Sequence, residues 1–343
     1  MVQTLDVLEP IQADYVDTLT FTLSQRPQIE ALTAKLRVSG VTNVYLVGAG
    51  GSLTVMYPLQ FLFDQHATAF ATYLLTSAEL IARKPAALGP QSLVVVGSHT
   101  GTTPETVEAA EFARSRGAHV VALTRLADSR LAAAADLAFT YGSDHTVSEA
   151  KGLLLYQLGL SLLDRFGEWD DYTGALAALD AAPNALLQVK RQSEQSNARI
   201  ASGFKDAPLI YTLSSGPNYG VGYGFAMCYL QEMQWIDASP IHAAEFFHGA
   251  FEIVEESTPL ILLMGEDASR PEAERALRFA QKYTNNLVTI DTKDYDVPGI
   301  PARYRGLVSP LVLSAITTRL ASHFAAVRNH PLETRRYMFK VEY

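Results

Sequence analysis

Four hydroxyl side chains crowd one short segment in the first half of the chain. They are Ser98, Thr100, Thr102 and Thr103. The segment follows an apolar run over residues 93–96 that is typical of a buried strand, and a helical pattern begins near Pro104. The first turn of a helix has backbone N–H groups without internal partners and carries partial positive charge, so it binds anions, and nearby hydroxyls add donors. The segment therefore predicts a phosphate-binding loop.

The same plan occurs once earlier in the chain. An apolar run over residues 44–47 leads into Gly48, Gly50 and Gly51, and Ser52 follows at the start of a helical pattern. Neither loop matches a nucleotide-binding fingerprint, because the third glycine of the dinucleotide motif and the Gly-Lys-Ser/Thr of the Walker motif are both missing. Two hydroxyl loops without a lysine therefore favour a sugar phosphate over a nucleotide.

Helix capping is the alternative interpretation of either loop taken alone. Ser and Thr are common N-caps, and Thr102 and Glu105 have the spacing of a capping box. One cap needs a single hydroxyl, whereas the later loop supplies four. The excess of hydroxyls favours anion binding.

Two ionisable side chains in the second half of the chain could perform acid–base catalysis. Glu232 ends an otherwise apolar helical pattern, so burial is expected to raise the pKa of its carboxyl group. His248 lies in the sequence Glu-Phe-Phe-His-Gly. A carboxylate and an imidazole tuned near neutral pH can move protons between adjacent carbons and oxygens of a sugar. From the local pattern alone, a solvated glutamate and a hydrogen-bonded core histidine stay open as alternatives.

The composition narrows the class of protein. The chain of 343 residues is long enough for about two domains, and its net charge of −9 disfavours nucleic acid as a partner. The single cysteine, Cys228, excludes an internal disulfide and suits a reducing compartment. Residues 1–9 lack the pattern of a signal peptide, and no apolar run reaches the roughly 18 residues of a membrane span. These features together predict a cytoplasmic protein. The scattered histidines lack the spacing of metal ligands, so we expect no bound metal.

Strand and helix patterns alternate along the chain, which is typical of parallel sheets covered by helices on both faces. The first half predicts strands at 43–47, 69–74, 92–97, 118–123 and 136–140 and helices at 27–38, 53–65, 104–116 and 148–166. The second half predicts strands at 209–213, 259–264 and 286–291 and helices at 218–235, 270–283 and 308–328. Residues 168–200 are interpreted as a connection broken at Pro183, and residues 230–249 as a linker.

The hydroxyl loop at residues 98–103 and the pair Glu232 and His248 resemble the sugar isomerase (SIS) family. Domains of this family bind phosphosugars at a Ser/Thr-rich loop after a parallel strand. The loop pattern of the family is Ser-x-Ser-Gly-x-Thr, and residues 98–103 match it with Thr100 in place of the second serine. The resemblance implies an α/β fold of two tandem SIS domains, each a flavodoxin-like three-layer sandwich, over residues 27–170 and 195–330. The implied phosphate ligands are Ser52, Ser98, Thr100 and Thr103, and the implied neighbouring substrate contacts are Gly51, His99 and Gly101.

The spacing of Leu-x-Glu and His-Gly is similar to that in the isomerase half of glucosamine-6-phosphate synthase. The match implies that Glu232 moves a proton between C1 and C2 of the sugar and that His248 aids ring opening. Tyr229 stands where the synthase carries a lysine, three residues before the glutamate, which counts against aminating chemistry.

The chain more closely resembles the stand-alone fructosamine-6-phosphate deglycases, of the fructoselysine and fructose-aspartate types. They share the length, the Glu–His pair and a C-terminal tail like residues 331–343, which implies a tail over the active site with Lys340 as a third catalytic residue. Phe339 departs from the small residue expected in the lysine-handling enzymes, so the amine half of the substrate stays open.

The resemblance implies an enzyme that cleaves a 6-phosphorylated fructosamine to glucose 6-phosphate and a free amine, without a metal or redox cofactor. It also implies a homodimer in which His248 completes the site at Glu232 of the other chain. Two alternatives stay open: a ketose–aldose phosphosugar isomerase or aminosugar-phosphate deaminase, and a non-catalytic phosphosugar-binding regulator. Neither nucleic acid nor a membrane is expected as a partner.

Overall fold

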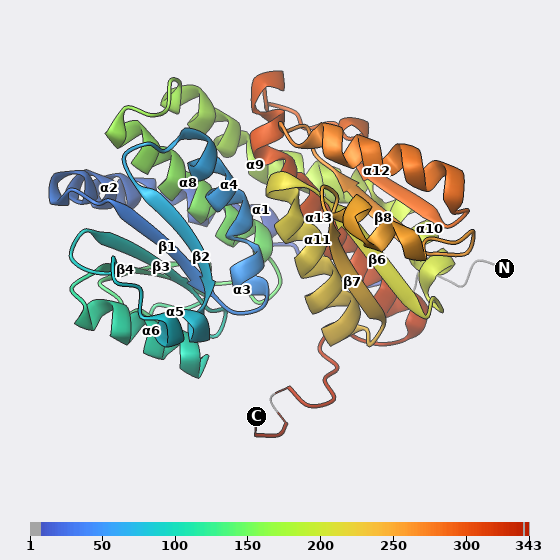
Figure 1. Ribbon diagram of the computed structural model, residues 1–343, viewed down its shortest axis with the longest axis horizontal. Helices are drawn as coiled ribbons and strands as arrows, with labels where there is room; N and C mark the ends of the chain where they lie inside the picture. The colour runs from blue at the N-terminus through green and yellow to red at the C-terminus, as the bar shows by residue number, and fades with distance from the viewer. Residues whose placement is uncertain (1–7, 339, 343) are drawn as a thin grey trace. The chain divides into compact units, whose positions relative to one another are not determined.

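The computed structural model describes residues 8–338 and 340–342, so Phe339, Tyr343 and residues 1–7 lie outside the described part of the chain. The chain divides into two compact units (Figure 1). The first unit comprises residues 12–183, and the second unit comprises the rest of the described chain. Each unit contains one parallel sheet with helices packed on it, which confirms the predicted α/β fold.

The first unit contains a five-stranded sheet in the order β2-β1-β3-β4-β5, in which all neighbours are parallel. Its strands are β1 (Asn43–Gly48), β2 (Ala71–Thr76), β3 (Ser92–Gly97), β4 (His119–Thr124) and β5 (Leu137–Thr140). Its helices are α1 (Tyr15–Ser24), α2 (Arg26–Ser39), α3 (Gly51–Thr54), α4 (Tyr57–His66), α5 (Ser77–Arg83), α6 (Pro104–Ser115), α7 (Arg130–Ala134) and α8 (Ser148–Phe166). Helices α2 and α8 pack together on one face of the sheet, and α5 and α6 on the other (Figure 1).

The central strands of the first sheet are buried because long apolar runs need cover on both faces. Every residue of β3 is buried, and so is every residue of β1 after Asn43. Val94 and Val96 belong to one core cluster with residues of α6. Strands β1 and β3 are neighbours, with Gly48 opposite Gly97. The strand order therefore reverses at their carboxyl ends, which is where open α/β sheets bind ligands.

The second unit contains a four-stranded parallel sheet in the order β7-β6-β8-β9. Its strands are β6 (Leu209–Ser214), β7 (Asp237–His242), β8 (Leu260–Met264) and β9 (Leu287–Asp291). Its α-helices are α10 (Glu194–Phe204), α11 (Tyr219–Gly224), α12 (Arg270–Tyr283) and α13 (Arg305–Arg328). Short 3₁₀ segments are η2 (Gly216–Asn218), η4 (Phe246–His248), η5 (Ala250–Ile253), η6 (Thr292–Asp294) and η7 (Ala302–Tyr304), and the π-helix η3 (Phe225–Met233) continues α11. Helix α9 (Tyr172–Gln192) runs from one unit into the other.

Helices α1, α5 and α7 have no counterpart among the predicted elements, and three further elements differ from the sequence patterns. Strand β7 lies inside the predicted linker, because an edge strand tolerates the missing N–H of Pro240. Helix α9 continues through Pro183, where the sequence predicts a break. The helix predicted over 53–65 is divided into α3 and α4, with Pro58 in the first turn of α4.

The segment over residues 302–328, which contains α13, is long and apolar enough to cross a membrane by length and composition. It is the one such segment in the described part of the chain, and 67% of its most apolar window is buried. Leu313, Ile316 and Phe324 are fully enclosed. This burial identifies α13 as a core helix of the second unit.

Candidate active site

Two loops lie at the carboxyl ends of β1 and β3. One contains Gly51 and Ser52 at the start of α3, and the other spans residues 98–103 before α6. A Cβ placed on Gly97 would lie 3.4 Å from the Cβ of Ser52 and 2.9 Å from the Cε of Met56. The glycine that ends β3 therefore allows the two hydroxyl loops to meet.

Paired hydroxyls hold the later loop in shape. Ser98 is buried, its Oγ lies 2.8 Å from Thr103 Oγ1, and it accepts a hydrogen bond from the Gly101 N–H at 3.1 Å. Thr100 and Thr102 are exposed, and their hydroxyl oxygens are 2.7 Å apart. Each pair uses one of its two hydroxyl protons, so each pair keeps a donor for an anion.

The first turn of α6 distinguishes anion binding from capping. The N-cap residue is Thr103, and its side chain makes no capping hydrogen bond. Its hydroxyl is paired with Ser98 instead. The alternative prediction of a capping box from Thr102 to Glu105 is therefore wrong. The positive end of α6 stays available for an anion.

A buried lysine reaches the earlier loop, contrary to the expectation that hydroxyls act there without one. Lys151 on α8 is 2% exposed, and its Nζ donates a hydrogen bond of 2.7 Å to Ser52 Oγ. The ammonium also lies 5.6 Å from the centre of the Tyr141 ring. This positive charge beside the loops favours an anionic ligand. Its signal in the sequence is a lone lysine ahead of the apolar run at residues 153–156.

His99 stays neutral at physiological pH. Its Nδ1 lies 2.9 Å from the Tyr141 hydroxyl, and its Nε2 lies 3.4 Å from a carboxylate oxygen of Asp144. Burial and the charge of Lys151, opposed by Asp144, lower the pKa of His99 to about 4. His99 therefore acts as a neutral hydrogen-bonding group, and Lys151 supplies the charge.

In the corresponding loops of the second unit, an aspartate carboxylate takes the polar donors. They follow β6 and β8, the two central strands of that sheet. The Asp267 carboxylate accepts hydrogen bonds from Asn218 Nδ2 at 2.6 Å and from the Ser269 backbone N–H at 2.9 Å. An internal carboxylate therefore already satisfies these donors of the second unit.

Glu232 lies near the end of the π-helix η3 and is largely buried, and π-helical turns are frequent at functional sites. Arg335 of the C-terminal tail places its Nη2 2.8 Å from Glu232 Oε1. Burial raises the pKa of Glu232, and the charge and hydrogen bond of Arg335 oppose that rise. The raised pKa agrees with the prediction from the sequence. No sequence spacing points to Arg335, because it lies in a different segment of the chain.

The other two predicted catalytic residues lie on the surface of the second unit. His248 is exposed at the end of η4. Lys340 is exposed, and its Nζ donates to the carbonyl oxygen of Arg335 at 2.5 Å. Among the described residues, no hydrogen bond joins either side chain to Glu232. The catalytic roles of His248 and Lys340 therefore stay predictions. The expected influence of Phe339 on the choice of amine also stays a prediction, because Phe339 lies outside the described part of the chain.

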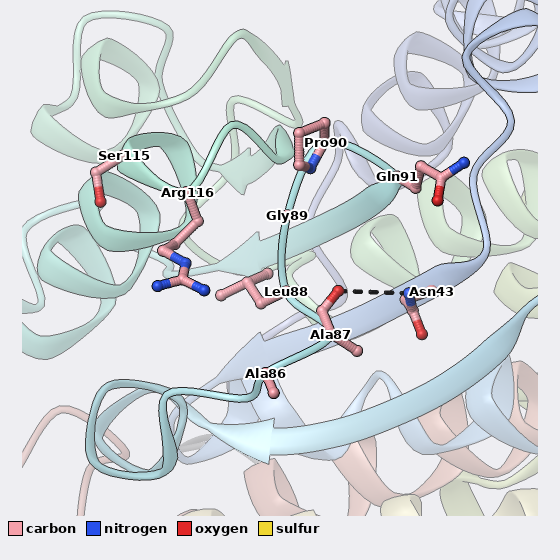
Figure 2. A pocket seen from close by; sticks show the side chains of 9 residues that line it. All are labelled: Asn43, Ala86, Ala87, Leu88, Gly89, Pro90, Gln91, Ser115 and Arg116. Atoms are coloured by element: carbon pink, nitrogen blue, oxygen red, sulfur yellow. Dashed lines mark hydrogen bonds between the residues drawn. The ribbon is translucent and has the colours of Figure 1, made fainter.

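One surface hollow lies away from the hydroxyl loops. A hollow of about 710 Å³ is lined by the start of β1, the loop before β3 and the end of α6 (Figure 2). Asn43 donates a hydrogen bond of 3.5 Å to the Ala87 carbonyl oxygen there (Figure 2). These segments lie at the amino ends of β1 and β3, opposite the hydroxyl loops. In residues 8–338 and 340–342, no group of three or more His, Cys, Asp or Glu side chains could hold a metal ion.

We expect Gly101→Ala to distort the phosphate loop. Gly101 has a φ of +66°, and a Cβ there would lie 2.4 Å from the Cβ of Ser129. Affinity for fructose 6-phosphate, measured by calorimetry, should fall about 10-fold or more, because displacement of the loop removes hydrogen bonds to a charged ligand. Gly142→Ala is the matched control, since Gly142 has a φ of +68° but open space at its Cβ. Equal affinities in the two variants would contradict the role of the loop.

Lys151→Met tests the charge beside the loops. Because the Lys151 ammonium lowers the pKa of His99, its removal should move the NMR titration of the His99 ring to higher pH and weaken binding of fructose 6-phosphate. Lys190→Met is the control, since Lys190 is also buried but hydrogen-bonds to Thr318 at 2.6 Å. A His99 titration that is unchanged by loss of Lys151 would refute this electrostatic picture.

Comparison with known proteins identifies the family. The model of the SIS domain matches residues 37–164. Fructosamine deglycase FrlB from Bacillus subtilis is 38% identical over 318 residues, covering 92% of this chain and 97% of the relative. Fructoselysine 6-phosphate deglycase from Escherichia coli is 27% identical, with 91% and 89% covered.

A solved structure agrees with these relatives. A protein from Salmonella typhimurium, described as a candidate phosphosugar isomerase, superposes with a TM-score of 0.89 at 33% identity, over 93% of this chain and 97% of that one. The similarity extends over nearly the whole chain and confirms the resemblance seen in the loop motif. The chain belongs to the SIS family.

Proposed function

We propose that the protein is a fructosamine-6-phosphate deglycase, which converts a 6-phosphorylated fructosamine to glucose 6-phosphate and a free amine. The observation that carries this proposal is the similarity to fructosamine deglycase FrlB over 97% of that protein. The buried carboxylate of Glu232 supports it, because a base with a raised pKa suits proton abstraction next to a carbonyl group. The isomerase and regulator alternatives are less favoured, because the two relatives named deglycases match this chain over 97% and 89% of their own length.

The phosphate end of the substrate is assigned to the loops of the first unit. The implied ligands Ser52, Ser98, Thr100 and Thr103 surround the ends of β1 and β3. Lys151 adds positive charge beside these ligands, because its ammonium donates a hydrogen bond to Ser52. Binding energy gained at the phosphate then supports chemistry several bonds away, because it fixes where C1 and C2 lie.

Glu232 is assigned the proton transfers. After ring opening, aided by His248, the carboxylate removes a proton from C1 while the C2 carbonyl oxygen gains one, which gives an enaminol. Return of a proton to C2 forms a protonated imine between C1 and the nitrogen. Water adds to C1, the C–N bond breaks, and the amine leaves with the proton that balances it. The products are glucose 6-phosphate and the free amine.

The working unit is proposed to be a cytoplasmic homodimer in which His248 of one chain serves Glu232 of the other. The exposed position of His248 supports this arrangement, because the imidazole is open to a second chain. Lys340 is assigned to the sugar, and its place in the tail next to Arg335 supports that role.

Glu232→Gln should lower the release of glucose 6-phosphate by about 10²–10⁴-fold, because the amide cannot accept the C1 proton. The assay uses a panel of phosphorylated fructosamines, with fructose 6-phosphate and glucosamine 6-phosphate as control substrates. Glu245→Gln is the matched control variant, since Glu245 is exposed and lies just before η4. Activity of Glu232→Gln within a few-fold of wild type would remove this residue from the mechanism.

Mixing two inactive variants tests the shared site. Chains carrying Glu232→Gln and chains carrying His248→Ala should regain activity when they are unfolded and refolded together, because each heterodimer has one site with both wild-type residues. Either variant refolded alone serves as the blank. Heterodimers that form but stay inactive would place both residues of a site in one chain.

A further inference from the structure

The C-terminal tail meets Glu232 through an arginine to which the family resemblance gives no role. The Nη2 of Arg335 lies 2.8 Å from Oε1 of Glu232, and the two side chains are only 14% and 23% exposed. In the described residues, no hydrogen bond reaches Oε2. The ion pair therefore engages one of the two carboxylate oxygens.

Arg335 is oriented by its own segment. Its Nη1 donates to the carbonyl oxygens of Leu332 at 2.5 Å and Thr334 at 3.1 Å. The Thr334 N–H donates to the Pro331 carbonyl oxygen at 3.0 Å and closes a turn. The guanidinium is thus fixed before it meets the carboxylate, which lowers the entropy cost of the ion pair.

Further contacts dock the tail beside Glu232. The His330 ring lies 4.5 Å from the Trp235 ring, and the Arg336 guanidinium lies 4.4 Å from the same ring. Gln234 Nε2 donates to the His330 carbonyl oxygen at 2.8 Å. Trp235 itself has a φ of +55°, a conformation that is rare for a bulky residue. Residues 330–336 are therefore anchored to the residues that directly follow Glu232 in sequence.

Arg335 is the charged group that acts on Glu232. The elements packed on η3 are α11, α13, β6 and β7. They carry other titratable side chains, among them Tyr219, Tyr223, Asp237, His242 and Arg328. In the described part of the chain, Arg335 alone shifts the pKa of Glu232 by charge, and it opposes the effect of burial.

We propose that Arg335 is a positioning residue for the base: it holds Oε1 of Glu232 in a fixed ion pair, so that Oε2 can take the substrate proton. The catalytic consequence rests on the proposed function, but the ion pair and its effect on the carboxylate do not. Loss of Arg335 leaves a carboxylate whose charge is no longer compensated, so its protonation becomes easier.

The test compares three substitutions of Arg335 with one of its neighbour. Arg335→Met and Arg335→Gln remove the charge, and Arg335→Lys keeps a charge. Arg336→Met removes the contact between the Arg336 guanidinium and Trp235 but leaves the ion pair. The first readout is the carboxyl carbon of Glu232 in glutamate-labelled protein, assigned with Glu232→Gln and followed by NMR from acid to neutral pH. The second readout is the acid limb of kcat/KM for a fructosamine 6-phosphate.

We expect the Glu232 titration midpoint to rise by about one pH unit in Arg335→Met and Arg335→Gln. The midpoint of the acid limb of kcat/KM should move to higher pH by a similar amount. In Arg335→Lys and Arg336→Met, both midpoints should stay near the wild-type values. A midpoint unchanged in a folded Arg335→Gln protein overturns the proposal, even if activity falls. A wild-type protein that releases no glucose 6-phosphate, but whose midpoint responds to Arg335, refutes the proposed function and supports the positioning role.

Discussion

The carboxylate of Glu232 can serve as a base only in its charged form, and its position inside the second unit opposes that charge. Taking an ion out of water costs several kcal/mol unless a partner compensates for the lost hydration. Arg335 is that partner, at 2.8 Å, and the turn that fixes it belongs to the C-terminal tail. The chemistry assigned to η3 therefore depends on a segment that lies beyond the last strand and helix of the fold.

The phosphate site proposed for the first unit has the opposite requirement, because a phosphate arrives with its water shell. Its polar groups there are a helix end without a side-chain cap, two hydroxyl pairs and the Lys151 ammonium, which donates to Ser52. The second unit repeats the strand order but fills the equivalent place with Asp267. The same architecture therefore holds a carboxylate at this place in the second unit, whereas the proposed phosphate site lies in the first unit.

The parts of this arrangement that are local in sequence could be predicted, and the parts that depend on long-range contacts could not. Buried parallel strands and the Ser98–Thr103 loop leave a continuous pattern of apolar, glycine and hydroxyl residues. Strand β7 could not be predicted, because Pro240 is compatible only with an edge strand. A single sequence does not show which strands lie at the edge of a sheet. The pairs Lys151–Ser52 and Arg335–Glu232 join distant segments, so no spacing rule predicts them.

Proton removal from C1 is the central chemical claim, and deuterium at that carbon tests it most directly. A fructosamine 6-phosphate that carries two deuterons at C1 is incubated with the enzyme, and the sugar product is analysed by mass spectrometry and NMR. We expect glucose 6-phosphate with one deuteron at C1, while the other appears at C2 or in the solvent. Fructose 6-phosphate with both deuterons still at C1 would contradict the claim, because the C–N bond would then break without help from the Glu232 carboxylate.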